Sequence, residues 1–181
     1  MENRKLVLYI ACSLDGRIAK PNNDMSFLDR VQVEGEDYGY YDFIKSIDTI
    51  ILGRKTYEWV MTQVAEYPYK EQDVYVITRT ERPKKDNITF YAGDLGELVT
   101  RLKSKPGKNI FCDGGAEIVH ALLSAKLFDE LVFSIIPVIL GDGTTLFKAG
   151  IPEADLKLIS SKAYDSGLVQ LKYHINHGAN G

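Results

Sequence analysis

The chain has 181 residues, of which 45% are hydrophobic and 26% are charged, and its formal net charge is −3. This composition is that of a globular protein and excludes an intrinsically disordered chain. Because a domain averages roughly 150 residues, we expect one domain over residues 1–181. The small, polar ending HGANG predicts a flexible tail at 177–181.

Two classes of partner are disfavoured by the same data. The Lys and Arg residues form no stripe, which argues against nucleic acid as the main partner. The longest apolar run, at 131–140, is shorter than the about 20 residues that a membrane-spanning helix needs. The first residues contain no convincing cleavage site for a secretory signal. We therefore expect a cytoplasmic protein that binds neither nucleic acid nor membrane.

The cysteines and histidines predict neither a disulfide nor a metal site. Cys12 and Cys112 each lie inside an apolar segment, which favours buried free thiols over a disulfide. The three histidines have no ligand spacing with each other or with the cysteines. They are His120, His174 and His177.

Apolar runs and amphipathic segments alternate along the chain. The predicted strands, in order, are 4–14, 49–53, 73–79, 87–93, 109–114 and 129–140. The predicted helices are 36–47, 54–64, 95–105 and 116–127. Two further β-runs flank Asp165-Ser166-Gly167, which is a hairpin signal. This order predicts a three-layer α/β fold, with a central, mostly parallel sheet and a C-terminal antiparallel hairpin.

Two predicted strands end in glycine where a helix begins. The segments are ILGRKTYE (51–58) and FCDGGAE (111–117). A helix N-terminus carries unpaired N–H groups and a partial positive charge, and glycine lets an oxygen approach that backbone closely. Two such ends in one sheet suit a ligand with several phosphates. Neither segment is a GxGxxG or a P-loop motif, so plain tight turns are the alternative.

Charged residues near these ends extend the phosphate hypothesis. Arg54 opens the helix after Gly53, and Arg79 follows Thr78 at the end of a strand. Guanidinium groups suit an extra monophosphate, the feature that separates NADP from NAD, although solvated arginines on loops are equally compatible with the pattern. Asp15 comes directly after the first strand, where ligands gather in open α/β sheets, and it either contacts a polar substrate or caps the turn.

Taken in order, these segments resemble a known family. IACSLDGRIA, LGRKTYE, VITR, DGGAEI and IIPVILGDGTTLF follow one another as in the dihydrofolate reductase-like family, over residues 4–176. The chain is most similar to the subgroup that resembles the C-terminal reductase domain of the riboflavin-pathway enzyme RibD. The resemblance implies the three-layer fold predicted above and NADPH as cofactor.

The resemblance also implies roles for individual residues. Ala11 and Ile18 are expected beside the nicotinamide carboxamide through their backbone atoms. The phosphates are expected at Gly53, Arg54, Lys55 and Thr56, with Arg54 near the 2′-phosphate. Thr78 and Arg79 are expected to flank the adenosine end. The pyrophosphate is expected at Gly114, Gly115, Ala116 and Glu117. Asp15 is the expected catalytic, substrate-side polar group.

The implied activity is hydride transfer to a small heterocyclic or carbonyl substrate, like 5-amino-6-(5-phosphoribosylamino)uracil or a pterin. The alternative is an NADPH- or nucleotide-binding module without turnover. Folate reductases hold the pterin with an acidic residue after the first loop, and Asp29, Glu34 and Glu36 are the candidates here. The zinc motif of the RibD deaminase half is absent. The tyrosines at 38, 40 and 41 form a helix face or wall a flat substrate. The family and the apolar run 131–140 also suggest a homodimer.

Overall fold

The computed structural model describes residues 4–177, in which strands and helices alternate. The strands are β1 Leu6–Ser13, β2 Arg17–Ala19, β3 Ile47–Gly53, β4 Asp73–Ile77, β5 Ile88–Tyr91, β6 Asn109–Gly114, β7 Glu130–Ile136, β8 Thr144–Thr145, β9 Asp155–Ala163 and β10 Val169–Asn176. The helices are η1 Pro21–Asn23, η2 Ser26–Val31, α1 Tyr40–Lys45, α2 Arg54–Gln63, α3 Leu95–Lys103 and α4 Ala116–Ser124. The predicted tail at 177–181 lies outside the described residues except for His177.

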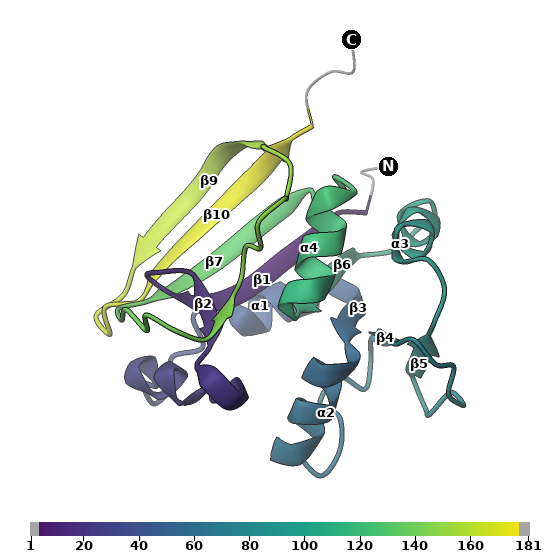
Figure 1. Cartoon of the computed structure of the whole chain (residues 1–181), viewed down its shortest axis with the longest axis horizontal. Helices are drawn as coiled ribbons and strands as arrows, with labels where there is room; N and C mark the ends of the chain where they lie inside the picture. The colour runs from purple at the N-terminus through teal and green to yellow at the C-terminus, as the bar shows by residue number, and fades with distance from the viewer. Residues whose placement is uncertain (1–3, 178–181) are drawn as a thin grey trace.

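Eight strands form the central sheet, in the order β5-β4-β3-β6-β1-β7-β10-β9 (Figure 1). Six neighbouring strands of this sheet are parallel to one another: β5, β4, β3, β6, β1 and β7. Strand β10 is antiparallel to β7 and to β9, so the chain closes with the predicted hairpin. The short strands β2 and β8 pair separately. The α/β fold and the mostly parallel sheet are therefore confirmed.

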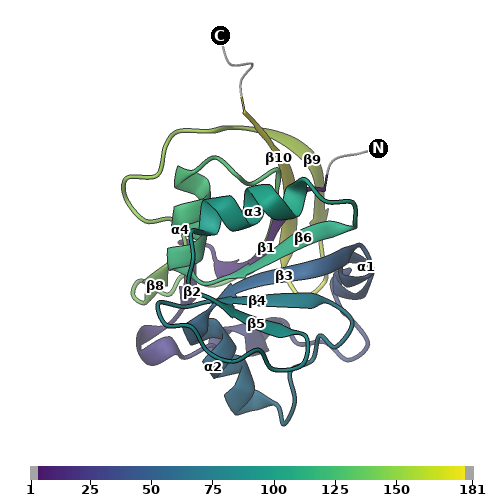
Figure 2. The same cartoon turned by 90° about the vertical axis from the view of Figure 1, so that its right-hand side faces the viewer.

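Helices cover both faces of this sheet. Figure 2 shows α3 and α4 on one side of β3 and β4, and α2 on the other. Ile51 belongs to the hydrophobic core under α3 and α4, whereas Ile50 and Leu52 belong to the core under α1 and α2. All three are fully buried. Two buried faces explain why this strand is a continuous apolar run rather than an alternating one.

Most predicted elements are somewhat shorter in the structure, and two of them lose the most residues. The predicted helix 36–47 begins only at Tyr40, because Tyr38 and Gly39 have left-handed φ values of 56° and 80°. The predicted strand 129–140 ends at Ile136, because Pro137 has no N–H for the ladder. Strand β7 lies between β1 and β10 with most residues buried. Its apolar character therefore reflects its interior position and not a surface.

A buried arginine closes the amino edge of the parallel strands. Arg4 is 7% exposed. Its guanidinium donates to the Lys108 carbonyl at 2.6 Å, to the Leu102 carbonyl at 3.1 Å and to Thr49 Oγ1 at 2.8 Å, and it pairs with Asp48. The start of β1 is thus tied to α3 and β6. Since β10 is antiparallel to β7, its last residues also lie at this edge. No helix within 4–177 has the length and apolarity to span a membrane.

Candidate functional site

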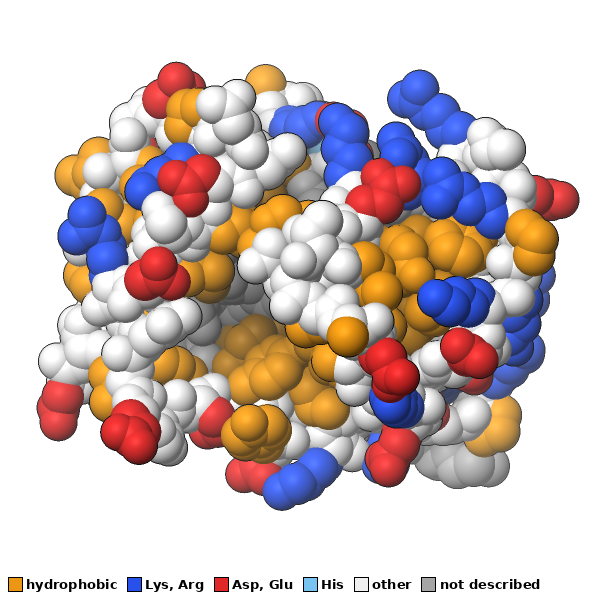
Figure 3. Space-filling model, turned by 90° about the horizontal axis from the view of Figure 1, so that it is seen from below, with side chains coloured by type: hydrophobic (Ala, Val, Ile, Leu, Met, Phe, Trp, Pro, Cys, Tyr) orange, Lys and Arg blue, Asp and Glu red, His pale blue; other side chains and the backbone are white. Residues whose placement is uncertain are grey.

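The parallel strands bring the predicted site residues to one edge. Strands β1, β3, β4 and β6 end there, so the segments that begin at Asp15, Gly53, Thr78 and Gly114 lie along the same carboxyl edge. Figure 3 looks onto this side from below and shows a hydrophobic floor hollowed between polar walls, with Lys and Arg side chains gathered along part of the rim. This is the edge at which open α/β sheets bind ligands.

The N-termini of α2 and α4 adjoin each other at this edge. Leu52 pairs with Gly114, and a Cβ added at Gly53 would lie 3.8 Å from the Gly114 carbonyl oxygen. A Cβ added at Gly115 would lie 3.3 Å from Thr56 Oγ1. Neither helix has a side-chain cap, so no side chain takes up the N–H groups of its first turn. The φ of Gly114 is +87°, a conformation that favours glycine, and the Gly114–Gly115 peptide bond is cis.

Basic side chains flank α2 at the same edge. Arg54 Nη1 lies 2.8 and 2.7 Å from the two carboxylate oxygens of Glu58. Arg82, which the sequence analysis did not select, lies 3.6 Å from Glu58 and 5.5 Å from the centre of the Phe90 ring. Arg79 is exposed just after β4. The arrangement places the guanidinium groups of Arg54 and Arg82 beside Glu58 of α2.

The remaining predicted cofactor residues lie on four elements, α2, α4, β1 and β2. Lys55 is exposed on the first turn of α2. Glu117, on the first turn of α4, forms an ion pair with Lys148. Ala11 lies in β1 opposite Ser134. Ile18, in β2, packs against the core under α3 and α4, and Ala116 begins α4 as a buried residue.

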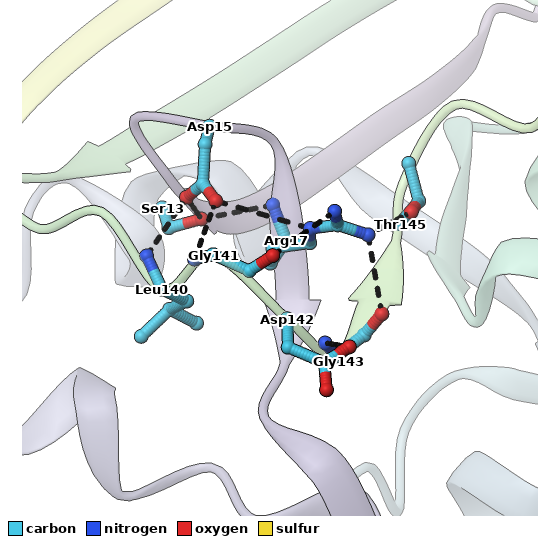
Figure 4. Close-up of polar contacts among 8 residues, drawn as sticks. All are labelled: Ser13, Asp15, Arg17, Leu140, Gly141, Asp142, Gly143 and Thr145. Atoms are coloured by element: carbon cyan, nitrogen blue, oxygen red, sulfur yellow. Dashed lines mark hydrogen bonds and ion pairs between the residues drawn. The ribbon is translucent and has the colours of Figure 1, made fainter.

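Asp15 organises the loop that follows β7. Its Oδ1 accepts from Ser13 Oγ at 2.6 Å and from the Leu140 amide at 3.0 Å, and its Oδ2 accepts from the Gly141 amide at 2.8 Å (Figure 4). The Ser13 hydrogen bond is the largest cause that lowers the pKa of Asp15 to about 2. Arg17 extends this anchoring by donating to the Gly143 carbonyl and to Thr145. Asp15 is therefore an ionised carboxylate that holds the loop 137–145 against the end of β1.

A second carboxyl group at the edge escaped the sequence analysis. Asp113 comes directly before Gly114, and burial raises its pKa to about 7. Burial is the largest cause that raises the pKa of Tyr69 to about 12, and the negative charge of Asp113 is the next largest. The same two causes raise the pKa of Tyr67 further. Tyr40 and Tyr69 share a hydrogen bond between their hydroxyl groups. The signal in the sequence was a carboxyl group at the end of a buried strand, immediately before the glycine pair.

The three acidic residues that the sequence analysis proposed from the first loop do not form a carboxyl group like that of Asp113. Asp29, Glu34 and Glu36 are all exposed. Of the tyrosines at 38, 40 and 41, Tyr40 lies against the Asp113 group, whereas Tyr41 is exposed. The carboxyl group of this edge whose pKa is raised by burial therefore comes from β6.

The cysteines are free and buried, as predicted. Burial raises the pKa of Cys12 to about 11 and that of Cys112 to about 12. Among residues 4–177, no group of three or more His, Cys, Asp or Glu side chains is placed to hold a metal ion.

Comparisons with known proteins show the family and the fold of the chain. The sequence pattern of the RibD C-terminal domain matches residues 4–170. The uncharacterized protein YwjB of Bacillus subtilis is 41% identical over 171 residues, which cover 94% of this chain and 97% of that protein. The structure resembles that of a putative riboflavin biosynthesis protein from Shewanella sp. PV-4, with a TM-score of 0.86, 28% identity, and coverage of 96% and 99% of the two chains.

The fold is also shared with a more distant enzyme. The structure of dihydrofolate reductase from Enterococcus faecalis, complexed with NADP(H) and RAB-propyl, has a TM-score of 0.66 at 17% identity and coverage of 95% and 96%. The resemblance inferred from the sequence is confirmed. The chain belongs to the RibD C-terminal domain family, a reductase-type family with the dihydrofolate reductase-like fold.

Proposed function

We propose that this chain is an NADPH-dependent reductase that transfers a hydride to a small heterocyclic or carbonyl substrate. The observation that carries the proposal is the meeting of two uncapped helix N-termini at the carboxyl edge, with Gly53 beside Gly114. Such paired N–H groups suit a pyrophosphate. The dihydrofolate reductase of the same fold, described with NADP(H), supports the choice of a nicotinamide cofactor.

The chain's own groups fit such a cofactor. The backbone N–H groups of Gly114, Gly115, Ala116 and Glu117, together with those of Gly53, Lys55 and Thr56, would hold the phosphates of the bound cofactor. A Cβ at Gly115 would approach Thr56 to 3.3 Å, so glycine keeps this cradle open. When bound, NADPH supplies the hydride.

The two ends of the cofactor are held by different parts of the edge. Arg54 binds the 2′-phosphate, with Thr78 and Arg79 beside the adenosine. Arginine forks bind phosphate oxygens in a bidentate manner, which favours NADPH over NADH. Backbone atoms of Ala11 and Ile18 orient the nicotinamide carboxamide, close to where Asp15 fixes the loop 137–145.

The substrate side lies over β6. With a pKa of about 7, the Asp113 carboxyl group holds a proton in roughly half of the molecules at neutral pH. Beside it stand Tyr40, Tyr67 and Tyr69, whose rings suit a flat heterocycle of the uracil or pterin type. In this proposal Asp113 donates a hydrogen bond or proton to the reduced group. Asp15 is the second polar group on the substrate side, and it also positions the loop 137–145 there.

The proposal extends to the setting of the protein. Two free cysteines suit the reducing cytoplasm. Its partner is the small-molecule substrate. The protein acts as a homodimer in this proposal.

Calorimetric titration with NADPH and NADH tests the cofactor assignment. We expect NADPH to bind at least about 10-fold more tightly, since a bidentate phosphate contact contributes about 1.5–3 kcal/mol. Arg54→Ala removes this preference. Glu58→Gln releases Arg54 from its present partner and strengthens NADPH binding without affecting NADH. Lys105→Ala, at the amino edge, is the control. Equal affinity for the two cofactors, or for plain nucleotides, contradicts the proposal.

Turnover separates the enzyme from a binding module. The panel contains pterins, aminouracils and aldehydes, and NADPH oxidation is followed by absorbance. Oxidation with one class and a loss on Asp113→Asn support the reductase. Tight NADPH binding with no oxidation across the panel favours the module without turnover.

A further inference from the structure

The hydroxyl group of Tyr67 is buried without a hydrogen-bond partner. Tyr67 lies in the loop after α2 and is 7% exposed, and no group within residues 4–177 forms a hydrogen bond with its hydroxyl oxygen. A buried polar atom that stays unpaired destabilises the folded chain. Phenylalanine would fill the same space without this cost, so packing does not account for the hydroxyl group.

A series of aromatic contacts places Tyr67 on the substrate side of the site. The ring centres of Tyr67 and Tyr69 are 5.5 Å apart, and the Tyr69 hydroxyl group shares a hydrogen bond with that of Tyr40. The Tyr40 ring centre lies 6.5 Å from that of Phe111, and Asp113 follows Phe111 by two residues on β6. Burial is the largest cause that raises the pKa of Tyr67, and the charge of Asp113 is the next largest. The Tyr67 hydroxyl and the Asp113 carboxyl group therefore lie close to each other.

The Asp113 side chain is also without a protein partner. No group within the described part of the chain forms a hydrogen bond or an ion pair with its carboxyl group, and burial is what raises its pKa. Tyr67 and Asp113 do not bond each other, whereas Tyr40 and Tyr69 satisfy one another. Two neighbouring polar groups that bond neither the protein nor each other leave places for two polar atoms of a ligand.

We propose that the Tyr67 hydroxyl group donates a hydrogen bond to a ring carbonyl oxygen of the substrate and so determines which substrates are accepted. This inference rests on the proposed reductase function, in which Asp113 serves the group that is reduced. Tyr67 then needs a second polar atom on the same molecule. A heterocycle with a ring carbonyl group supplies that atom. A simple aldehyde has one oxygen, leaves Tyr67 unpaired and is therefore the poorer substrate.

A water molecule is the rival partner for this hydroxyl group. Tyr67 also borders a cavity of about 450 Å³ between α2, the loop after it and the start of β5. A water held there belongs to the folded chain in the absence of substrate, so its hydrogen bond would stabilise the fold. A bond made only to the substrate contributes nothing to the stability of the free chain. The stability of Tyr67→Phe therefore separates the two partners.

Calorimetric titration with a matched pair of probes tests the proposal. Diaminouracil carries two ring carbonyl groups, whereas triaminopyrimidine keeps the ring and the amino groups but has no carbonyl group. We expect the wild type to bind diaminouracil at least about 10-fold more tightly, and Tyr67→Phe to lose most of this preference. Tyr75→Phe is the matched control, because Tyr75 lies on β4 and packs against the core under α3 and α4. It should bind both probes as the wild type does.

The probes are titrated into the chain without NADPH, so the result does not depend on the cofactor. A chain that fails to bind NADPH but shows this preference refutes the reductase and keeps the role of Tyr67 in binding. Urea unfolding of Tyr67→Phe completes the test, and a stability equal to or above that of the wild type is expected. A less stable Tyr67→Phe variant overturns the proposal in favour of water. A wild type without the preference, or a Tyr67→Phe variant that retains it, also overturns the proposal.

Discussion

Replacing Asp113 with Asn should remove a specific pH dependence from the stability of this protein. Burial raises the pKa of this carboxyl group from its ordinary 3.8 to about 7. Below pH 4 the carboxyl group is protonated in both the folded and the unfolded chain. Between pH 4 and 7 the unfolded chain releases the proton while the folded chain keeps it. The free energy of unfolding therefore falls as pH rises through this window and levels off above pH 7.

The size of the effect follows from the shift. About three pKa units at about 1.4 kcal/mol each give a ceiling of about 4 kcal/mol between pH 4 and pH 8. Part of the residue is accessible, so the measured loss should fall below that ceiling. The Asn side chain does not titrate, and the variant should therefore match the wild type at pH 4.5 and exceed it at pH 8.

Urea unfolding of both proteins at several pH values measures this difference. Subtracting the variant from the wild type removes the other titrating groups. Asp15, whose pKa is lowered to about 2, acts below the window. If the difference between the two proteins stays within about 0.5 kcal/mol from pH 4.5 to 8, Asp113 is not a buried acid and its role as a proton-holding group fails.

Three further changes probe other parts of the structure. Gly143→Ala puts a Cβ 2.0 Å from the Ala19 carbonyl oxygen, whereas the Cβ of Gly141→Ala meets nothing within 4 Å. Gly143→Ala should therefore lower the free energy of unfolding by several kcal/mol more than Gly141→Ala. Similar melting temperatures for the two variants would contradict this account. Tyr67→Phe removes a buried hydroxyl group that has no hydrogen-bond partner among residues 4–177, so it should leave the stability unchanged or raise it by up to about 2 kcal/mol. Tyr40→Phe loses the hydrogen bond to Tyr69 and should destabilise the protein. A clear loss of stability in Tyr67→Phe means that the Tyr67 hydroxyl group does form a hydrogen bond. Asp15→Ala should speed hydrogen exchange at the Leu140 and Gly141 amides, which donate to the Asp15 carboxylate. In the wild type the protection of these amides should persist as pH falls to about 4, because Asp15 is protonated only toward pH 2. Unchanged exchange in the variant shows that the loop is held by other contacts.

Much of the fold could be predicted from local signals. Strand β3 is a run of apolar residues, and Gly53 marks its end, so both the strand and the helix after it were predictable. The hairpin of β9 and β10 was predictable from its turn residues alone. Parallel strands then bring Gly53 and Gly114 to one edge, as the alternation of strands and helices requires.

The missed features depend on contacts between distant segments. Asp113 is a carboxyl group whose pKa is raised by burial in the folded chain, where its charge acts on tyrosines from α1 and from the loop after α2. Arg82 reaches Glu58 from the loop between β4 and β5, across 24 positions in the sequence. The exposure of both faces of β9 follows from its place at the end of the sheet, which nothing within its nine residues encodes. The start of α1 depends on left-handed residues that its composition does not reveal.

The position of Arg4 has a practical consequence. Its guanidinium fastens the beginning of β1 at the edge farthest from the glycine-rich helix starts, and β10 finishes at that same edge. A purification tag, fluorescent label or sensor surface attached before Arg4 or after β10 therefore starts from the edge opposite the hollow seen in Figure 3. Ligand binding can be measured on immobilised protein from both orientations, and agreement between the two serves as a check on access to the site.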